Sequence, residues 1–390
     1  MTRHRPLATE YDSSAFYLDA VSSRQRERLD IAVILHDFPL GGTERIAIRL
    51  ANEWAAGGNK VTLICGSMKG PLLPLVGASV RTIALDPAIE RGAGSRYRLG
   101  QAAAGILRDL RADIVFIPGN FHWRAIPALM RLPAAIRPRI AVQLSTPLER
   151  YDRGPIRQFF YDRRMRRLLR GVDAAISLED RMTGQADRIL GRRITRRIAT
   201  PALADATPRP RRIDPAGRTI VAAGRLEAVK GFDIAIAAFA RLQDSDARLV
   251  ILGEGPMRAQ LEQLAVDLGV ADRVELPGYV PCIRPWLDKA RMFVLSSRYE
   301  GYPAVLVEAI AAGRPVVATR CTPAVADLVD GTGFGRSVAI NDPEALACAM
   351  AAMLDSPLPD VHRMAASVEP FRIESVAIAY TDLFESLCAA

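Results

Sequence analysis

Two glutamates, Glu300 and Glu308, lie eight positions apart in a segment whose pattern predicts a loop followed by a helix. Gly301 and Pro303 follow the first acid and favour a turn. The second acid lies in an apolar stretch that we expect to end as a helix at Gly313. The bare amides at the start of such a helix can bind a phosphate. The two acids could then reach groups on either side of it, such as sugar hydroxyls.

A second segment places two cations at the end of a predicted strand. The strand at residues 219–223 runs into Gly-Arg225-Leu-Glu-Ala-Val-Lys230-Gly. Arginine offers a planar fork for two oxygens and lysine a compact charge, so the pair could neutralise a pyrophosphate leaving group by electrostatic preorganisation. The alternative is a surface Arg and Lys at a strand-to-helix turn. The only D-x-D pattern considered for a metal, Asp244-Ser-Asp246, falls in an expected helix-to-strand loop, and we expect no metal.

Together the two segments resemble the C-terminal half of the family-4 (group 1) retaining glycosyltransferases of the GT-B fold. That family carries a G-R-L-x-x-x-K-G element and an E-G-x-P-x-x-x-x-E-A element in this order, and both occur here. The resemblance extends over roughly residues 30 to 390, and is also visible at Gly41-Gly-Thr-Glu-Arg45, Leu252-Gly-Glu-Gly-Pro256 and Leu276-Pro-Gly-Tyr-Val280.

The resemblance implies roles for the two acids and the helix start. Glu308 would bind the ribose hydroxyls of a nucleotide-sugar donor, and Glu300 would contact the transferred hexose or stabilise positive charge at its ring. The alternative for Glu308 is a helix N-terminal acid that interacts favourably with the helix dipole. The amides expected to meet the phosphates or the sugar are those of Ala304, Val305 and Leu306. Arg225 and Lys230 would hold the diphosphate between the two acids.

Other positions are assigned to the donor by the same resemblance. Gly41 and Gly42 follow a strand, where glycines let the backbone approach a ligand, although they could simply form a turn. Gly253 and Gly255 either contact the nucleotide or end a strand. Tyr279 stands where the family places the nucleotide-base pocket, and its surroundings do not distinguish uracil from guanine.

An acceptor hydroxyl could need a base, and the sequence offers few histidines. His122 follows a predicted strand at the carboxyl edge of its sheet, where ligands bind in doubly wound folds, and it is our candidate. His36 lies at another strand end and is the alternative. Either could be a hydrogen-bonded structural histidine. His4 lies in the polar tail and His362 near the end of the second domain.

Short apolar runs alternate with helical stretches, which is typical of parallel, doubly wound α/β sheets. The predicted strands are 29–35, 60–65, 80–84, 114–117, 140–144, 174–177, 219–223, 248–252, 273–276, 292–295 and 315–319. The length of 390 residues favours two domains. We therefore predict a GT-B protein with two Rossmann-like domains that face a cleft. Its parts are a polar tail (1–29), an N-terminal acceptor-side domain (30–200, to which a helix at about 370–390 returns), a linker (201–217) and a nucleotide-sugar-binding domain (218–369).

The net charge of +9 is unevenly distributed. Residues 1–200 hold 33 Lys and Arg against 19 Asp and Glu, and the remainder holds 19 against 24. The basic maximum, Arg150 to Arg170, also contains Phe159, Phe160 and other apolar residues at roughly helical spacing. It could lie on an anionic membrane surface or form a solvated helix with one core face. Without a binding motif, nucleic acid is a poor alternative.

The compartment is inferred from what the sequence lacks. It contains five scattered cysteines without C-x-x-C spacing, no leader-like apolar segment and no apolar run long enough for a membrane span. We expect a cytoplasmic protein with reduced thiols that could associate with the inner face of the membrane.

Two departures from the family pattern leave the sugar and the acceptor open. Arg320-Cys-Thr-Pro-Ala-Val-Ala-Asp327 stands where the family often has Gly-Gly and then Glu, and Thr200-Pro-Ala-Leu replaces Asn-Gly-Val. The expected activity is metal-independent and cofactor-independent transfer of a hexose from a UDP- or GDP-sugar to a lipid-linked saccharide or surface-polysaccharide precursor. The alternatives are a nucleotide-sugar epimerase of the same fold and a non-catalytic membrane-associated partner protein. The oligomeric state stays open.

Overall fold

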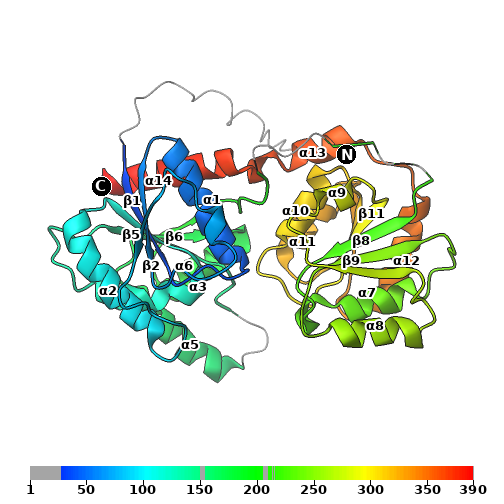
Figure 1. The fold of residues 1–390 in the computed structure, drawn as a ribbon, viewed down its shortest axis with the longest axis horizontal. Coiled ribbons are helices and arrows are strands. Elements are labelled where there is room, and N and C mark those ends of the chain that lie inside the picture. The colour runs from blue at the N-terminus through cyan, green and yellow to red at the C-terminus, as the bar shows by residue number, and fades with distance from the viewer. Residues whose placement is uncertain (1–27, 150–153, 205–209, 213, 215, 390) are drawn as a thin grey trace, which may run out of the picture.

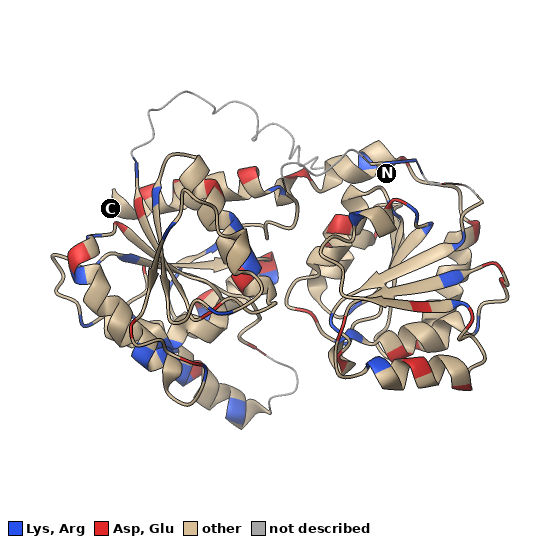
Figure 2. Cartoon of the chain, viewed as in Figure 1, with Lys and Arg blue, Asp and Glu red and all other residues tan. Residues whose placement is uncertain are grey.

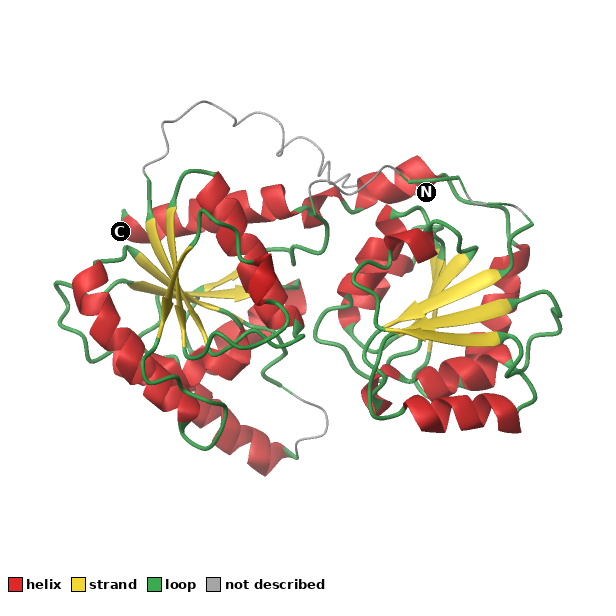
Figure 3. Ribbon diagram, viewed as in Figure 1, coloured by secondary structure: helices red, strands yellow, loops and turns green. Residues whose placement is uncertain are grey.

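The computed structural model describes residues 28–149, 154–204, 210–212, 214 and 216–389 (Figure 1). Residues 1–27 of the predicted tail, residues 150–153 of the basic segment and part of the predicted linker lie outside the described residues. The described chain forms two parallel sheets, each covered by helices, as Figure 3 shows in yellow and red. The predicted α/β class with two Rossmann-like sheets is confirmed.

The N-terminal sheet has seven strands within the described residues, in the order β3-β2-β1-β4-β5-β6-β7. Its strands are β1 (Asp30–Leu35), β2 (Lys60–Cys65), β3 (Arg81–Ala84), β4 (Ile114–Ile117), β5 (Arg139–Gln143), β6 (Ala174–Ser177) and β7 (Thr195–Arg197). All residues of β4 and β6 are buried, as expected for strands covered on both faces. The helices are α1 (Gly42–Ala56), η1 (Leu73–Leu75), α2 (Ser95–Leu110), α3 (Gly119–His122), η2 (Trp123–Ala125), α4 (Ile126–Leu129), α5 (Pro155–Leu168) and α6 (Asp180–Leu190).

The C-terminal sheet has six strands within the described residues, in the order β10-β9-β8-β11-β12-β13. They are β8 (Thr219–Ala223), β9 (Arg248–Leu252), β10 (Val274–Gly278), β11 (Met292–Leu295), β12 (Val316–Thr319) and β13 (Gly335–Val338). The helices are η3 (Ala228–Lys230), α7 (Phe232–Phe239), α8 (Arg258–Asp267), α9 (Arg284–Leu287), α10 (Ala304–Ala311), α11 (Pro323–Val329), α12 (Pro343–Asp355), α13 (Val361–Ser367) and η4 (Glu369–Phe371).

The last helix, α14 (Ile373–Cys388), returns to the N-terminal domain and lies beside α1 (Figure 1). Its Tyr380 and Phe384 join Trp54 of α1 and Phe116 of β4 in a cluster of edge-on rings, with centroids 5.3 Å apart for Trp54 and Phe384. Trp54 Nε1 donates to the Ala377 carbonyl at 3.3 Å. Such aromatic packing stabilises the crossover through buried area and ring geometry.

The described residues contain no helix that is both long enough and apolar enough to span a membrane.

Candidate active site between the domains

The carboxyl ends of strands from both sheets face one interdomain cleft, which has two lobes. The α10 lobe, of about 510 Å³, is lined among others by Gly42, Arg225, Lys230, Glu300, Ala304, Val305 and Glu308. The β10 lobe, of about 600 Å³, is lined among others by Gly41, Gly42, Arg225, Lys230, Gly253 and Tyr279. Arg225 and Lys230 line both lobes, so the two cations lie at their junction. This is the edge where doubly wound sheets bind ligands.

An ion pair joins the two motifs found in the sequence. Lys230 Nζ lies 2.7 Å from Glu300 Oε1, with both side chains mostly buried. Ser297 Oγ donates to the same Glu300 oxygen at 2.8 Å, and Ser296 Oγ donates to the Lys230 carbonyl at 3.0 Å. The two serines, which directly follow β11, therefore fix both members of the pair. Neither serine was among the predicted site residues, although polar residues at the carboxyl end of a buried strand are a signal for a site.

The turn after Lys230 depends on glycine. Gly231 has a φ of +63°, and a Cβ there would lie 2.1 Å from the Ser296 carbonyl oxygen. A larger residue would separate the β8 loop from the β11 loop and so break the arrangement that brings Lys230 to Glu300.

Arg225 is the most accessible of the predicted charged groups. Its side chain is 66% exposed, and its Nη1 lies 2.7 Å from Glu227 Oε1. An exposed ion pair of this kind contributes little to stability. The guanidinium can therefore exchange Glu227 for an anionic ligand at low cost, since the fork suits two phosphate oxygens.

Glu308 faces cations of the other domain. Burial raises the pKa of Glu308, and the charges of Arg49 and Arg45 on α1 oppose that rise. Burial likewise lowers the pKa of Arg49, an effect that Glu308 opposes. The carboxyl group thus sits in a desolvated place where hydroxyl donors would stabilise its charged form. Neither arginine was among the predicted site residues, although two arginines four residues apart on α1 are a signal for an acidic partner.

Family models match both domains. Residues 41–202 match the "Glycosyl transferase 4-like domain" and residues 217–356 match "Glycosyl transferases group 1". The chain belongs to the glycosyltransferases.

Individual relatives of this glycosyltransferase are bacterial polysaccharide enzymes. It is 32% identical over 283 residues to the putative colanic acid biosynthesis glycosyltransferase WcaL of Escherichia coli K12, which covers 67% of this chain and 66% of WcaL. It is 30% identical over 161 residues, 41% of this chain and 44% of the relative, to an N-acetylgalactosaminyltransferase of Campylobacter jejuni that acts on a diphospho-undecaprenol-linked saccharide. The match covers between 20% and 66% of the length of the first three curated relatives.

The fold of the glycosyltransferase is also that of solved structures. Anabaena HepE in complex with UDP and glucose superposes with a TM-score of 0.68 at 16% identity, covering 93% of this chain and 98% of HepE. The sucrose-phosphate synthase of Thermosynechococcus elongatus gives a TM-score of 0.74 at 19% identity, covering 93% and 100%. These likenesses confirm the GT-B architecture.

The four glycines predicted to contact the donor differ in their surroundings. Gly42 faces open space, whereas a Cβ on Gly41 would meet the Glu44 carboxylate. A Cβ on Gly253 would lie 1.8 Å from the Gly224 carbonyl oxygen, and one on Gly255 would lie 2.5 Å from the Leu226 carbonyl oxygen. These two glycines let the β9 loop pack against the β8 loop that carries Arg225. Gly255 lines neither lobe, so its contribution is to the shape of the site.

The start of α10 and Tyr279 also differ in exposure. Tyr279 is 50% exposed where it lines the β10 lobe. Leu306 is fully buried and lines neither lobe, and its amide donates to the Pro303 carbonyl. The Ala304 amide similarly donates to the Tyr302 carbonyl. Two of the amides assigned to a ligand are thus already used within the turn, which leaves Val305 as the open candidate.

His122 is placed differently from the prediction of an acceptor base. It is fully buried, its Nδ1 lies 2.7 Å from the Pro118 carbonyl, and its Nε2 accepts from the His36 amide at 3.2 Å. Burial lowers the pKa of His122 to about 4. Both ring nitrogens are engaged with backbone, so the structure favours a structural role. His36 is also buried, and burial lowers its pKa.

The described residues contain no group of three or more His, Cys, Asp or Glu that could hold a metal ion.

Proposed function

We propose that this chain transfers a hexose from a nucleotide diphosphate sugar to a hydroxyl of a lipid-linked saccharide or surface-polysaccharide precursor, with retention of configuration. The observation that carries the proposal is the Lys230–Glu300 ion pair at the junction of two interdomain lobes, with the exposed Arg225 guanidinium beside it.

The positions of these groups support a division of labour along one extended donor. Arg225 and Lys230 bind the diphosphate and stabilise the charge that develops on it as the bond to the sugar breaks. Glu300 contacts the hexose, and Glu308 accepts hydrogen bonds from the hydroxyl groups of the ribose. The bond from the anomeric carbon to the diphosphate breaks while the bond to the acceptor oxygen forms on the same face. The acceptor proton passes to the leaving diphosphate oxygen, so the reaction requires neither His122 nor a metal.

The comparisons favour particular substrates without deciding among them. HepE was crystallised with UDP and glucose, which favours a UDP-sugar as donor. The Campylobacter relative acts on a diphospho-undecaprenol-linked saccharide, which favours a lipid-linked acceptor.

The α5 surface is consistent with a lipid-linked acceptor, and we propose that it contacts an anionic membrane. The C-terminal half of α5 packs into the core through the buried Met165. Near its start, Ile156 is 72% exposed, and Phe159 and Phe160 are each 64% exposed. A cavity of about 500 Å³ at the far end is lined by Arg163, Arg166, Arg167, Leu169, Arg170, Leu190 and Arg192. Figure 2 shows this basic region along α5 at the lower left. Exposed aromatics next to arginines are typical of helices that lie at a lipid interface.

Donor binding tests the proposal most directly. UDP-, GDP- and ADP-sugars would be titrated against the full chain by calorimetry. We expect one nucleotide class to bind, and Arg225→Ala and Glu308→Ala each to weaken that binding at least tenfold. The proposal fails if no nucleotide sugar binds, or if both variants bind as the unmodified chain does. Sugar isomerised in the absence of any acceptor would indicate an epimerase instead.

A further inference from the structure

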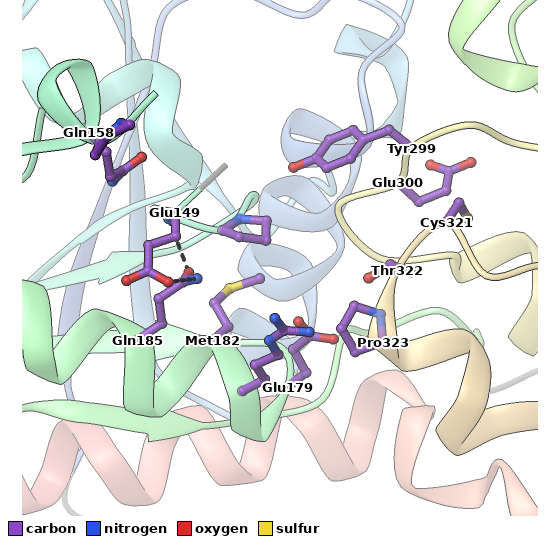
Figure 4. A pocket seen from close by; sticks show the side chains of 13 residues that line it. Glu149, Gln158, Glu179, Met182, Gln185, Tyr299, Glu300, Cys321, Thr322 and Pro323 are labelled. Carbon is purple, nitrogen blue, oxygen red and sulfur yellow. Dashed lines mark hydrogen bonds between the residues drawn. The ribbon is translucent and has the colours of Figure 1, made fainter. Parts of the chain in front are cut away.

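A third cavity lies between the domains, next to the donor cleft and separate from its two lobes. This α11 cavity, of about 510 Å³, is lined on one side by α6, the start of α5, Pro147 and Glu149. On the other side it is lined by the loops after β11 and β12 and by the start of α11. Figure 4 shows Glu149, Glu179 and Gln185 of the N-terminal domain facing Tyr299, Glu300 and Thr322 of the C-terminal domain across it. Glu300 lines both the α11 cavity and the α10 lobe.

Two buried polar side chains that line this cavity each have one oxygen atom without a hydrogen-bond partner among the described residues. Glu179 is 4% exposed, and its Oε2 is unpartnered. Thr322, on the opposite wall, is 7% exposed, and its Oγ1 is unpartnered. Burying an acceptor without a partner costs free energy. Two such atoms from different domains beside one cavity indicate a ligand that supplies the missing hydrogen bonds.

The other acid of the N-terminal wall is already satisfied. Glu149 Oε2 accepts from Gln185 Nε2 at 2.9 Å, and its Oε1 pairs with Arg188. Glu149 therefore helps to shape the wall, whereas Glu179 has an oxygen left for a ligand.

The charge of the lining selects the chemistry of that ligand. The charged side chains that line the cavity in the described part of the chain are Glu149, Glu179, Glu300 and Arg181. Carboxylates accept hydrogen bonds from hydroxyl groups and repel anions. Met182 and the prolines Pro147, Pro155 and Pro323 add apolar surface that suits the C–H faces of a sugar ring. The cavity therefore fits a neutral saccharide better than a uronic acid or a phosphosugar.

We propose that the α11 cavity binds the neutral terminal sugar of the acceptor, and that Glu179 Oε2 and Thr322 Oγ1 hydrogen-bond its hydroxyl groups. This inference rests on the proposed glycosyl transfer and names the acceptor subsite for it. A sugar held here lies against Glu300, which faces the transferred hexose. Arginines on α5 would meet the anionic carrier outside the cavity, so neutral sugar and charged carrier would bind in different places.

The electrostatics of Glu179 agree with this assignment. Burial raises the pKa of the Glu179 carboxyl, the charge of Asp327 on α11 adds to the rise, and the Ala324 amide opposes it. A hydroxyl donor at Oε2 would stabilise the charged form at this desolvated place.

Binding of small probes tests the subsite separately from the reaction. Methyl α-glucoside, methyl α-galactoside, methyl α-mannoside and methyl α-glucuronide would be titrated into the full chain with UDP present, using saturation-transfer NMR. We expect at least one neutral hexoside to bind and the glucuronide not to bind. Glu179→Gln, which keeps an oxygen for the Ala324 amide, should weaken the hexoside about tenfold or more. Thr322→Val should weaken it less, because it removes a neutral partner.

Asp180→Asn is the matched control, since it neutralises the next acid along α6, which pairs with Arg197 and does not line the cavity. It should leave hexoside affinity within about twofold, and UDP affinity should be unchanged in all three variants. The inference is overturned if no neutral hexoside binds, or if Glu179→Gln binds the hexoside with normal affinity. It is also overturned if Glu179→Gln loses as much affinity for UDP as for the hexoside. UDP binding without hexoside binding would reject the subsite alone, whereas failure of every nucleotide sugar to bind would reject the proposed function.

Discussion

The cleft wall of the C-terminal domain and the α5 surface of the N-terminal domain both carry conspicuous cations, but their partners differ. In the cleft, Lys230 pairs with Glu300 and Arg225 pairs with Glu227. On α5, the described residues give Arg163 and Arg167 no acidic partner, and the exposed Phe159 and Phe160 lie on the same helix.

The difference indicates two kinds of anionic partner. In a site that binds and releases a ligand at each turnover, acids of the protein can orient the cations while no ligand is bound, at a low cost in ligand affinity. A surface that meets a permanently anionic layer needs no such acids, because many weak contacts add together.

The largest expected effect concerns the paired cation of the cleft. Lys230→Ala removes a charge that stabilises the leaving diphosphate, and we expect turnover to fall about 100- to 1000-fold. Steady-state rates with the bound nucleotide sugar would measure this. Lys60→Ala, which removes an exposed lysine paired with Asp30 at the other end of β1, is the control and should keep near-normal turnover. A Lys230→Ala rate within threefold of normal would mean that the ion pair is structural.

His122 of the N-terminal domain differs from both sets of cations, because its buried side chain is uncharged at neutral pH. The folded pKa of His122 is about 4, below its ordinary value of 6.5. Between pH 6.5 and 4 the His122 ring is therefore protonated in the unfolded chain but stays neutral in the folded chain. The free energy of unfolding falls as the pH falls through this range. The loss is about 3 kcal/mol over that range.

Urea unfolding between pH 4.5 and 7.5 would measure this loss. The variant His122→Asn should be less stable at neutral pH, since it disturbs the contacts to Pro118 and His36, but its stability should depend less on pH. Equal pH slopes for the two proteins would show that other groups cause the acid sensitivity.

The sequence predicted most of this framework because buried parallel strands are continuous apolar runs. The strands β2, β4, β6, β8, β9 and β11 have the predicted bounds. The edge strands β7 and β13 were missed, since each is short and largely exposed or half-buried and so lacks that pattern. The crossover helix was recognisable from its amphipathic pattern, whereas the bounds of the linker stay a prediction.

The site was predictable where a motif fixes local geometry, and less so where contacts depend on the other domain. Arg225, Lys230, Glu300 and Glu308 line the cleft, and their roles toward a donor stay predictions. The sequence could not reveal that Glu179 meets α11, because that contact joins two domains whose relative position no local pattern specifies. His122 follows a strand end, as predicted, but the backbone groups around it decide that its ring is occupied.

The α5 surface can be separated from the cleft by changing its exposed rings. Phe159→Ser with Phe160→Ser should reduce sedimentation with phosphatidylglycerol vesicles about tenfold at low salt, through lost apolar burial. Binding by the unmodified chain should fall as salt rises, because the arginines contribute electrostatically. Tyr97→Ser and Leu268→Ser, which remove other exposed apolar residues, serve as controls. Absence of vesicle binding at low salt by the unmodified chain would reject membrane docking.

A smaller effect is expected from the acid that holds Arg225. If Glu227 is replaced as a partner when the diphosphate binds, Glu227→Gln should tighten nucleotide-sugar binding by up to about fivefold, the usual range for an exposed ion pair. Calorimetry would detect this, with Glu262→Gln, which breaks an exposed pair with Arg258 away from the cleft, as the matched control. Weaker binding in Glu227→Gln would show instead that Glu227 orients Arg225 for the ligand.

Removal of divalent metal ions is expected to have no effect on turnover, which is the smallest effect of the series. Two cations already lie at the junction of the lobes, and they can supply the charge stabilisation that other glycosyltransferases draw from a metal ion. Turnover in excess EDTA should therefore equal turnover in magnesium, and it should do so most clearly in the unmodified chain. In Lys230→Ala, partial recovery with magnesium would strengthen the assignment of Lys230 to the diphosphate. The unmodified chain could instead lose all activity in EDTA and regain it with a divalent ion. That result would show that the reaction requires a metal and that Arg225 and Lys230 alone do not stabilise the leaving diphosphate.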